Sequence, residues 1–97
     1  KVIKFYTDKN LRKNSFFSIK ENRMILNYNE FFSQPHEIIL RSLSNLIKSI
    51  SKNYYPVRGK KIEKIISEIK KKPSLKVTLG GCIIKRVNQT VIISKEH

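Results

Sequence analysis

The segment 75–93 constrains the fold of this chain more than any other part of the sequence. Its first residues, 75–79, alternate between apolar and polar, which is the period of a half-buried strand. The glycine pair at 80–81 then permits a bulge or a sharp bend. Two arms rich in β-branched residues flank Asn88-Gln89 and predict a β-hairpin. The first arm of this hairpin carries a Lys-Arg pair at 85–86.

Two amphipathic helices are predicted before this segment. The first begins at Pro35, because proline suits the first helical position, and Glu37 in the first turn complements the helix dipole. The second runs over about 60–72 and is stopped by Pro73. Each has an apolar stripe at helical spacing, made by Ile39, Leu43, Leu46, Ile47 and Ile50 in the first and by Ile62, Ile65, Ile66 and Ile69 in the second.

The N-terminal part gives weaker patterns. Residues 1–15 contain apolar residues that could share a helical face, but their polar runs are typical of loops. Two short strands are expected between 16 and 26 around a turn at Glu21-Asn22, and one helical turn with inward aromatic residues at 28–32. The whole pattern predicts an α+β fold in which a helical hairpin packs against a short antiparallel sheet.

The chain has 97 residues, enough for one domain at most, and we expect residues 1–97 to form a single domain. It begins with Lys1 rather than methionine, so we expect a fragment of a longer protein. No apolar run approaches the roughly 20 residues that cross a bilayer, and the start lacks the features of a signal peptide. The single Cys82 suits a reducing compartment, so we expect a cytoplasmic protein with no membrane partner.

The charge is strongly positive, with 21 Lys and Arg against 7 Asp and Glu and a net charge of +14. Codon bias could enrich Lys, Ile and Asn, but the same bias should also raise Glu, which stays scarce. A field of this sign favours polyanions, because each phosphate that is neutralised releases condensed counterions. Nucleic acid is therefore the favoured partner.

No catalytic or metal-binding motif is present. The histidines, His36 and His97, have no second type of ligand near them in sequence, and the carboxylates are spread too thinly for an acid/base pair. Cys82 is interpreted as a buried small hydrophobe rather than a nucleophile, because no matching general base stands out. Gly80-Gly81 lacks the pattern of a phosphate loop, and no helix follows it.

Basic residues are more promising together than singly. Lys60, Lys61 and Lys64 flank the second helix, and Arg58 precedes it. The neighbours at 85–86 alternate across the hairpin, so they point to opposite sides. A shared patch that binds phosphate is the favoured interpretation. Tyr54 and Tyr55 could stack on unpaired bases, although capping the core at a loop is the simpler role.

The order of several short motifs points to one family. Gln-Pro-His-Glu-Ile-Ile-Leu-Arg at 34–41 precedes Tyr-Pro-Val-Arg at 55–58 and the isoleucine-striped helix. Thr-Leu-Gly-Gly-Cys-Ile-Ile at 78–84 and Ile-Ile-Ser-Lys-Glu at 92–96 follow. Over about residues 24–96 the chain resembles the region after the catalytic domain of bacterial tRNA(Ile)-lysidine synthetases, particularly the alphaproteobacterial type.

This resemblance implies a tRNA-recognition part that is not catalytic by itself. Enzymes of this family use ATP, with Mg expected, to activate the wobble cytidine of the CAU anticodon of tRNA(Ile), and lysine then attacks the activated base. That chemistry belongs to a PP-loop domain with a Ser-Gly-Gly-x-Asp-Ser motif, which this sequence lacks, so no cofactor is expected here. The RNA contacts that the resemblance implies are Arg41, Arg58, Lys61, Lys85 and Arg86.

Two other functions remain open at this point. A stand-alone basic nucleic-acid-binding protein of ribosomal or nucleoid type would share the charge and would bind without preference for tRNA. A structural or interaction module whose charge reflects only genomic bias would bind RNA weakly. A complete enzyme within this chain is the least favoured alternative.

Overall fold

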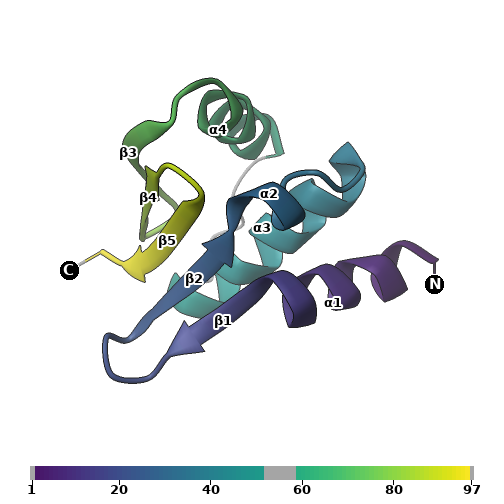
Figure 1. Cartoon of the computed structure of the whole chain (residues 1–97), viewed down its shortest axis with the longest axis horizontal. Helices are drawn as coiled ribbons and strands as arrows, with labels where there is room; N and C mark the ends of the chain where they lie inside the picture. The colour runs from purple at the N-terminus through teal and green to yellow at the C-terminus, as the bar shows by residue number, and fades with distance from the viewer. Residues whose placement is uncertain (1, 52–58, 97) are drawn as a thin grey trace.

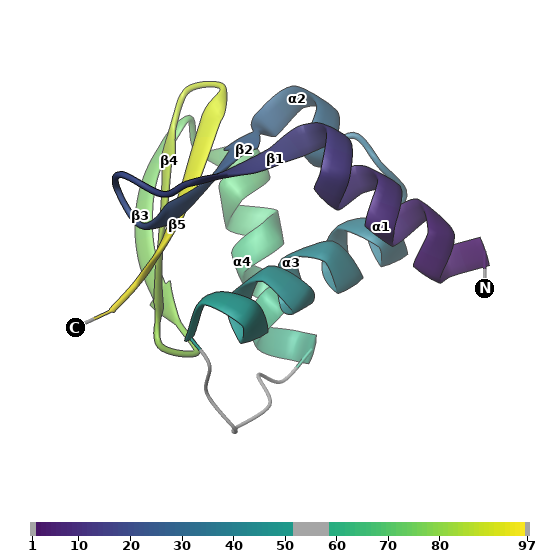
Figure 2. The same cartoon turned by 90° about the horizontal axis from the view of Figure 1, so that it is seen from below.

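The computed structural model describes residues 2–51 and 59–96, and Figure 1 shows their course. The elements of this part follow in the order α1 (Val2–Asn14), β1 (Ser15–Ser18), β2 (Arg23–Asn27), α2 (Tyr28–Phe31), α3 (His36–Ser51), α4 (Gly59–Lys71), β3 (Ser74–Leu79), β4 (Cys82–Val87) and β5 (Thr90–Lys95). The strands form one antiparallel sheet in the order β1-β2-β5-β4-β3. Figure 2 shows α1, α3 and α4 on one side of this sheet. The α+β prediction, with a helical hairpin on an antiparallel sheet, is confirmed.

Tight turns join the last three strands. Gly80 and Gly81 have φ angles of 58° and 83° and connect Leu79 directly to its partner Cys82. Two consecutive residues with positive φ make the turn type whose twist matches that of paired strands, and glycine adopts this backbone without steric cost. Asn88, with a φ of 55°, begins the second tight turn. The predicted sharp bend and hairpin are therefore confirmed.

The core lies between the helices and the covered face of the sheet. Phe31 and Phe32 are buried in it, as expected for inward aromatic residues at 28–32. Both predicted helical stripes are also confirmed, and only Ile50 of the two sets is partly exposed. Burial of one such side chain stabilises the fold by about 1.5–3 kcal/mol. The buried residues of the helical stripes are Ile39, Leu43, Leu46, Ile47, Ile62, Ile65, Ile66 and Ile69.

The helix α1 occupies residues whose polar runs were typical of loops. Its buried positions include Thr7 and Asn10, whereas Val2 and Phe5 are exposed, so the usual amphipathic pattern is reversed. The helix α1 is held by hydrogen bonds from Asn10 and by Leu11, which is partly buried against the core. Asn10 Nδ2 donates to Ser42 Oγ at 3.1 Å and to the Phe31 carbonyl at 3.4 Å. These partners lie far away in sequence, and for this reason hydrophobic periodicity could not settle the structure of residues 1–15.

Among the helices of residues 2–51 and 59–96, none combines the length and the apolar character that a bilayer crossing requires.

Replacing Asn10 with Ala should lower the free energy of unfolding by about 2 kcal/mol, because the Ser42 hydroxyl and the Phe31 carbonyl lose a buried donor. The exposed neighbour Lys9 provides the control, and Lys9→Ala should change this free energy by less than about 0.5 kcal/mol. Urea unfolding of both variants measures the difference. Equal stabilities of the two variants would show that the hydrogen bonds of Asn10 do not stabilise the packing of α1.

Candidate nucleic-acid interface

One face of the sheet is open. Side chains alternate along each strand, so the residues that do not face the helices share this open face. The strand register aligns them across the sheet, and each of them is at least partly exposed. The central row is Phe16, Ile25, Ile92, Lys85 and Lys76, and the rows beside it are Ser18, Arg23, Ser94, Ile83 and Thr78, and Asn27, Thr90, Val87 and Ser74.

The open face is basic. The five strands contain no Asp or Glu, and Lys76 and Lys85 are exposed and directly opposite each other on β3 and β4. Opposite residues of an antiparallel pair have their Cβ atoms about 5 Å apart, and like charges at this separation repel. Among the ion pairs of the described residues, none involves either lysine. A bound anion between the two ammonium groups would remove the repulsion.

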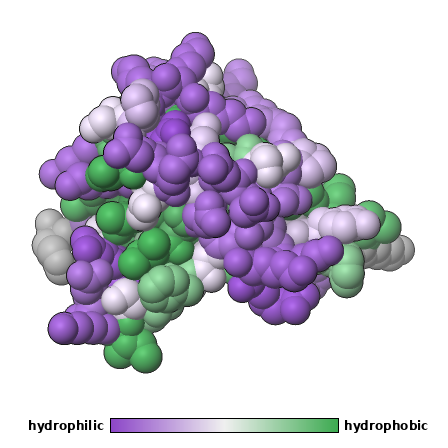
Figure 3. Space-filling model, viewed as in Figure 1, coloured by the Kyte–Doolittle hydropathy of each residue, from purple (hydrophilic) through white to green (hydrophobic). Residues whose placement is uncertain are grey.

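A groove extends this basic surface from β3 to α4. It encloses about 650 Å³ and is lined by Lys61, Lys64 and Glu68 of α4 and by Lys76 and Thr78 of β3, among others. Lys76 thus belongs both to the groove and to the open face. Figure 3 shows hydrophilic residues gathered over the α4 end of the molecule. The structure therefore joins Lys61 and Lys85 in one continuous surface through Lys76.

Lys76 was not among the contacts expected from the sequence. The sequence pattern places Lys76 in an alternating strand, but it does not show that Lys76 lies opposite Lys85. That position depends on the Gly80-Gly81 turn. Two-residue turns fix the register of a hairpin. A two-residue turn at Gly80-Gly81 pairs Leu79 with Cys82, and continuing this register pairs Lys76 with Lys85.

Arg86 has a different environment from its neighbour Lys85. It is 6% exposed, and its guanidinium lies 3.5 Å from the centroid of the Tyr28 ring. Its Nε donates to the Asn88 carbonyl at 2.7 Å, and its Nη1 donates to the carbonyls of Ile69 and Lys72 at the end of α4. A cation is favoured there because helix C-terminal carbonyls carry partial negative charge. Arg86 is therefore not part of the exposed basic surface, although it was among the RNA contacts expected from the sequence.

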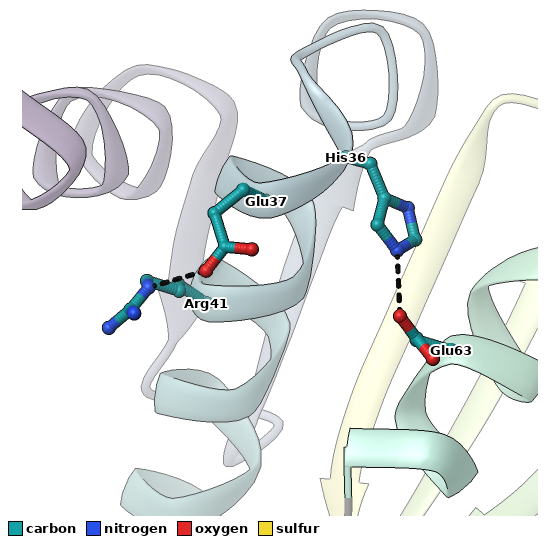
Figure 4. Close-up of polar contacts among 4 residues, drawn as sticks. All are labelled: His36, Glu37, Arg41 and Glu63. Atoms are coloured by element: carbon teal, nitrogen blue, oxygen red, sulfur yellow. Dashed lines mark hydrogen bonds and ion pairs between the residues drawn. The ribbon is translucent and has the colours of Figure 1, made fainter.

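Arg41 lies apart from the lysines. It is exposed on α3, and its Nε donates to Glu37 Oε2 at 2.8 Å (Figure 4). It lines a pocket formed by residues of α1 and α3. Figure 2 shows both of these helices on the same side of the sheet. Figure 4 also shows the contact between His36 Nε2 and Glu63 Oε2, at 3.3 Å, which links the first residue of α3 to the second turn of α4. The remaining expected contact, Arg58, lies outside the described residues, as do Tyr54 and Tyr55.

Cys82 is fully buried, and its Sγ donates to the Ile47 carbonyl at 3.6 Å. Burial raises the pKa of the Cys82 thiol above its ordinary value, a backbone hydrogen bond at Ser51 lowers it, and the charge of Glu96 raises it. Since a thiolate is the nucleophilic form, this thiol is unsuited to catalysis at neutral pH. Within residues 2–51 and 59–96, no three His, Cys, Asp or Glu residues gather where they could hold a metal ion.

Adjacent residues on β4 allow a test of their separate roles. Arg86→Leu should lower the free energy of unfolding by about 3 kcal/mol, because three carbonyls lose a charged donor. Lys85→Ala should change it by less than about 0.5 kcal/mol, since the side chain is exposed. Chemical unfolding of both variants measures this contrast. A stable Arg86→Leu protein would contradict the anchoring role.

Comparisons of the chain with models of protein families, with curated proteins and with solved structures found no match. Two features of the chain itself therefore bear on its function, namely the continuous basic surface from Lys61 to Lys85 and the order of the sequence motifs.

Proposed function

We propose that this chain is the tRNA-binding portion of a tRNA(Ile)-lysidine synthetase and that its basic surface contacts the RNA. The observation that carries the binding part of this proposal is the exposed pair of Lys76 and Lys85, which lie opposite each other and form no ion pair with a carboxylate of residues 2–51 or 59–96. The motif order over residues 24–96 supports the choice of family.

The surface suits the phosphate backbone of RNA. Lys76 and Lys85 are placed to hold one phosphate between them, and Lys61 and Lys64 are placed to hold another in the groove. The Thr78 hydroxyl lies in the same groove and can donate to a phosphate or a ribose oxygen. Each lysine-phosphate contact releases counterions, so affinity should fall steeply with salt. These contacts position RNA without reading its sequence.

The chemistry of the proposed parent enzyme lies outside this chain. Gly80 and Gly81 form a turn between two strands and do not precede a helix N-terminus, so this turn does not resemble a phosphate-binding loop. We assign no step in ATP or lysine chemistry to the described residues. Their proposed role is to hold tRNA(Ile) so that its CAU anticodon reaches a separate catalytic domain.

A stand-alone nucleic-acid-binding protein is the second candidate. The observation in its favour is that the cations of the groove and the exposed cations of β3 and β4 are lysines, which act as point charges and lack the planar fork of arginine. Such a protein would bind tRNA, duplex DNA and heparin in proportion to their charge. The family proposal instead expects tighter binding to tRNA than to the other polyanions at equal salt.

The double substitution Lys76→Ala with Lys85→Ala should lower tRNA affinity by about tenfold at moderate salt. The slope of the logarithm of the association constant against the logarithm of salt concentration should also fall by about 2, because two phosphate contacts are lost. Titration of labelled tRNA at several salt concentrations gives both quantities.

A matched control removes the same charge from the helical side. Lys9→Ala with Lys48→Ala takes two exposed lysines from α1 and α3 and should leave the slope nearly unchanged. If both double variants weakened binding equally, the open face would not be the interface. If wild-type protein bound heparin as tightly as tRNA at equal salt, the tRNA-specific proposal would fail.

A further inference from the structure

A second feature of the open face lies at the end away from β3. A shallow pocket of about 430 Å³ is formed beside the edge strand β1, and residues from α1, β2 and the β4–β5 turn complete it. It belongs to neither the α4–β3 groove nor the lysine pair. Its lining includes Lys13, Phe16, Ile25, Asn27 and Gln89.

Phe16 supplies an exposed aromatic surface in this pocket. It is 60% exposed and lies on the open face, opposite Ile25 of β2. Its neighbour Phe17 pairs with Met24 and therefore points to the opposite face of the strand, where the helices lie. An exposed ring on a sheet surface is a stacking platform for unpaired bases, because every base has a flat π-face.

Polar side chains that can hydrogen-bond to a nucleobase line the same pocket as this ring. Asn27 and Gln89 are exposed, and each amide offers both donors and an acceptor, as the Watson–Crick edge of a base does. Asn27 precedes α2, yet its side chain makes no capping hydrogen bond there. The exposed Lys13 adds a positive charge at the pocket and can meet a phosphate.

We propose that this pocket binds an unpaired nucleobase of RNA, stacked on Phe16 with its edge toward Asn27 and Gln89. This inference rests on the proposed RNA-binding function and extends it from the backbone to a base. Phe16 and the lysine pair lie in the same row across the sheet, separated by three to four strand spacings, or about 14–19 Å. One RNA strand crossing the sheet can therefore place phosphates at Lys76 and Lys85 and a base at Phe16.

The test compares a short unstructured RNA with the same RNA in which the bases are replaced by abasic sites. Both carry the same phosphates, so only the first can use the pocket. Wild-type protein should bind the base-containing RNA about tenfold more tightly, a typical effect of one good stacking contact. Phe16→Ala should abolish this preference, and Phe16→Tyr should keep it. Asn27→Ala with Gln89→Ala should reduce the preference severalfold without changing binding of the abasic RNA.

Phe17→Ala is the matched control, since it removes the same ring from the other face of β1 and should keep the preference. Thermal unfolding of each variant checks that the fold is retained. Equal binding of the two RNAs by wild-type protein, or a preference that survives Phe16→Ala, would overturn the pocket assignment. Both results leave the proposed function intact if tRNA is still bound, whereas absence of tRNA binding would contradict the proposed function itself.

Discussion

The alternation of side chains along β4 is the constraint on which both the packing and the surface of this molecule depend. Arg86 faces the helices, caps the end of α4 through the Ile69 and Lys72 carbonyls and packs against Tyr28. Lys85 faces outward and meets Lys76. Because side chains in a strand alternate strictly, a shift of register by one residue would exchange the two cations. The same register therefore holds the helical layer in place and creates the basic surface.

Much of the fold follows from periodicity in the sequence. The isoleucine stripe of α4 and the alternation in β3 have the two periods that distinguish helices from strands, and Gly80-Gly81 marks the turn. The helix α1 could not be found in this way, because Thr7 and Asn10 are polar residues that face inward. Two hydrogen bonds from Asn10 hold α1 to residues that the fold brings close, and no local sequence pattern predicts these partners.

The basic character of the candidate site was predictable, but its arrangement was not. The excess of Lys and Arg predicts a surface that attracts polyanions, and alternation along a strand places Lys85 and Arg86 on opposite sides. The sequence cannot say which of the two faces the helices, because the answer depends on where the end of α4 lies. The contribution of Lys76 depends on the hairpin register, and the separation of Arg41 from the lysines depends on which face the helices cover.

A pair of exposed lysines held opposite each other destabilises a sheet slightly, so its presence suits a surface that binds an anion. Replacing Lys85 with Glu tests this idea most directly, because stability and binding should change in opposite directions. The free energy of unfolding should rise by about 0.5 kcal/mol, since a cross-strand ion pair replaces a repulsion. The affinity for tRNA should fall by at least about tenfold, since a carboxylate then faces the phosphates. A Lys85→Glu protein that bound tRNA as tightly as the wild type would contradict the claim that the open face is the RNA-binding surface.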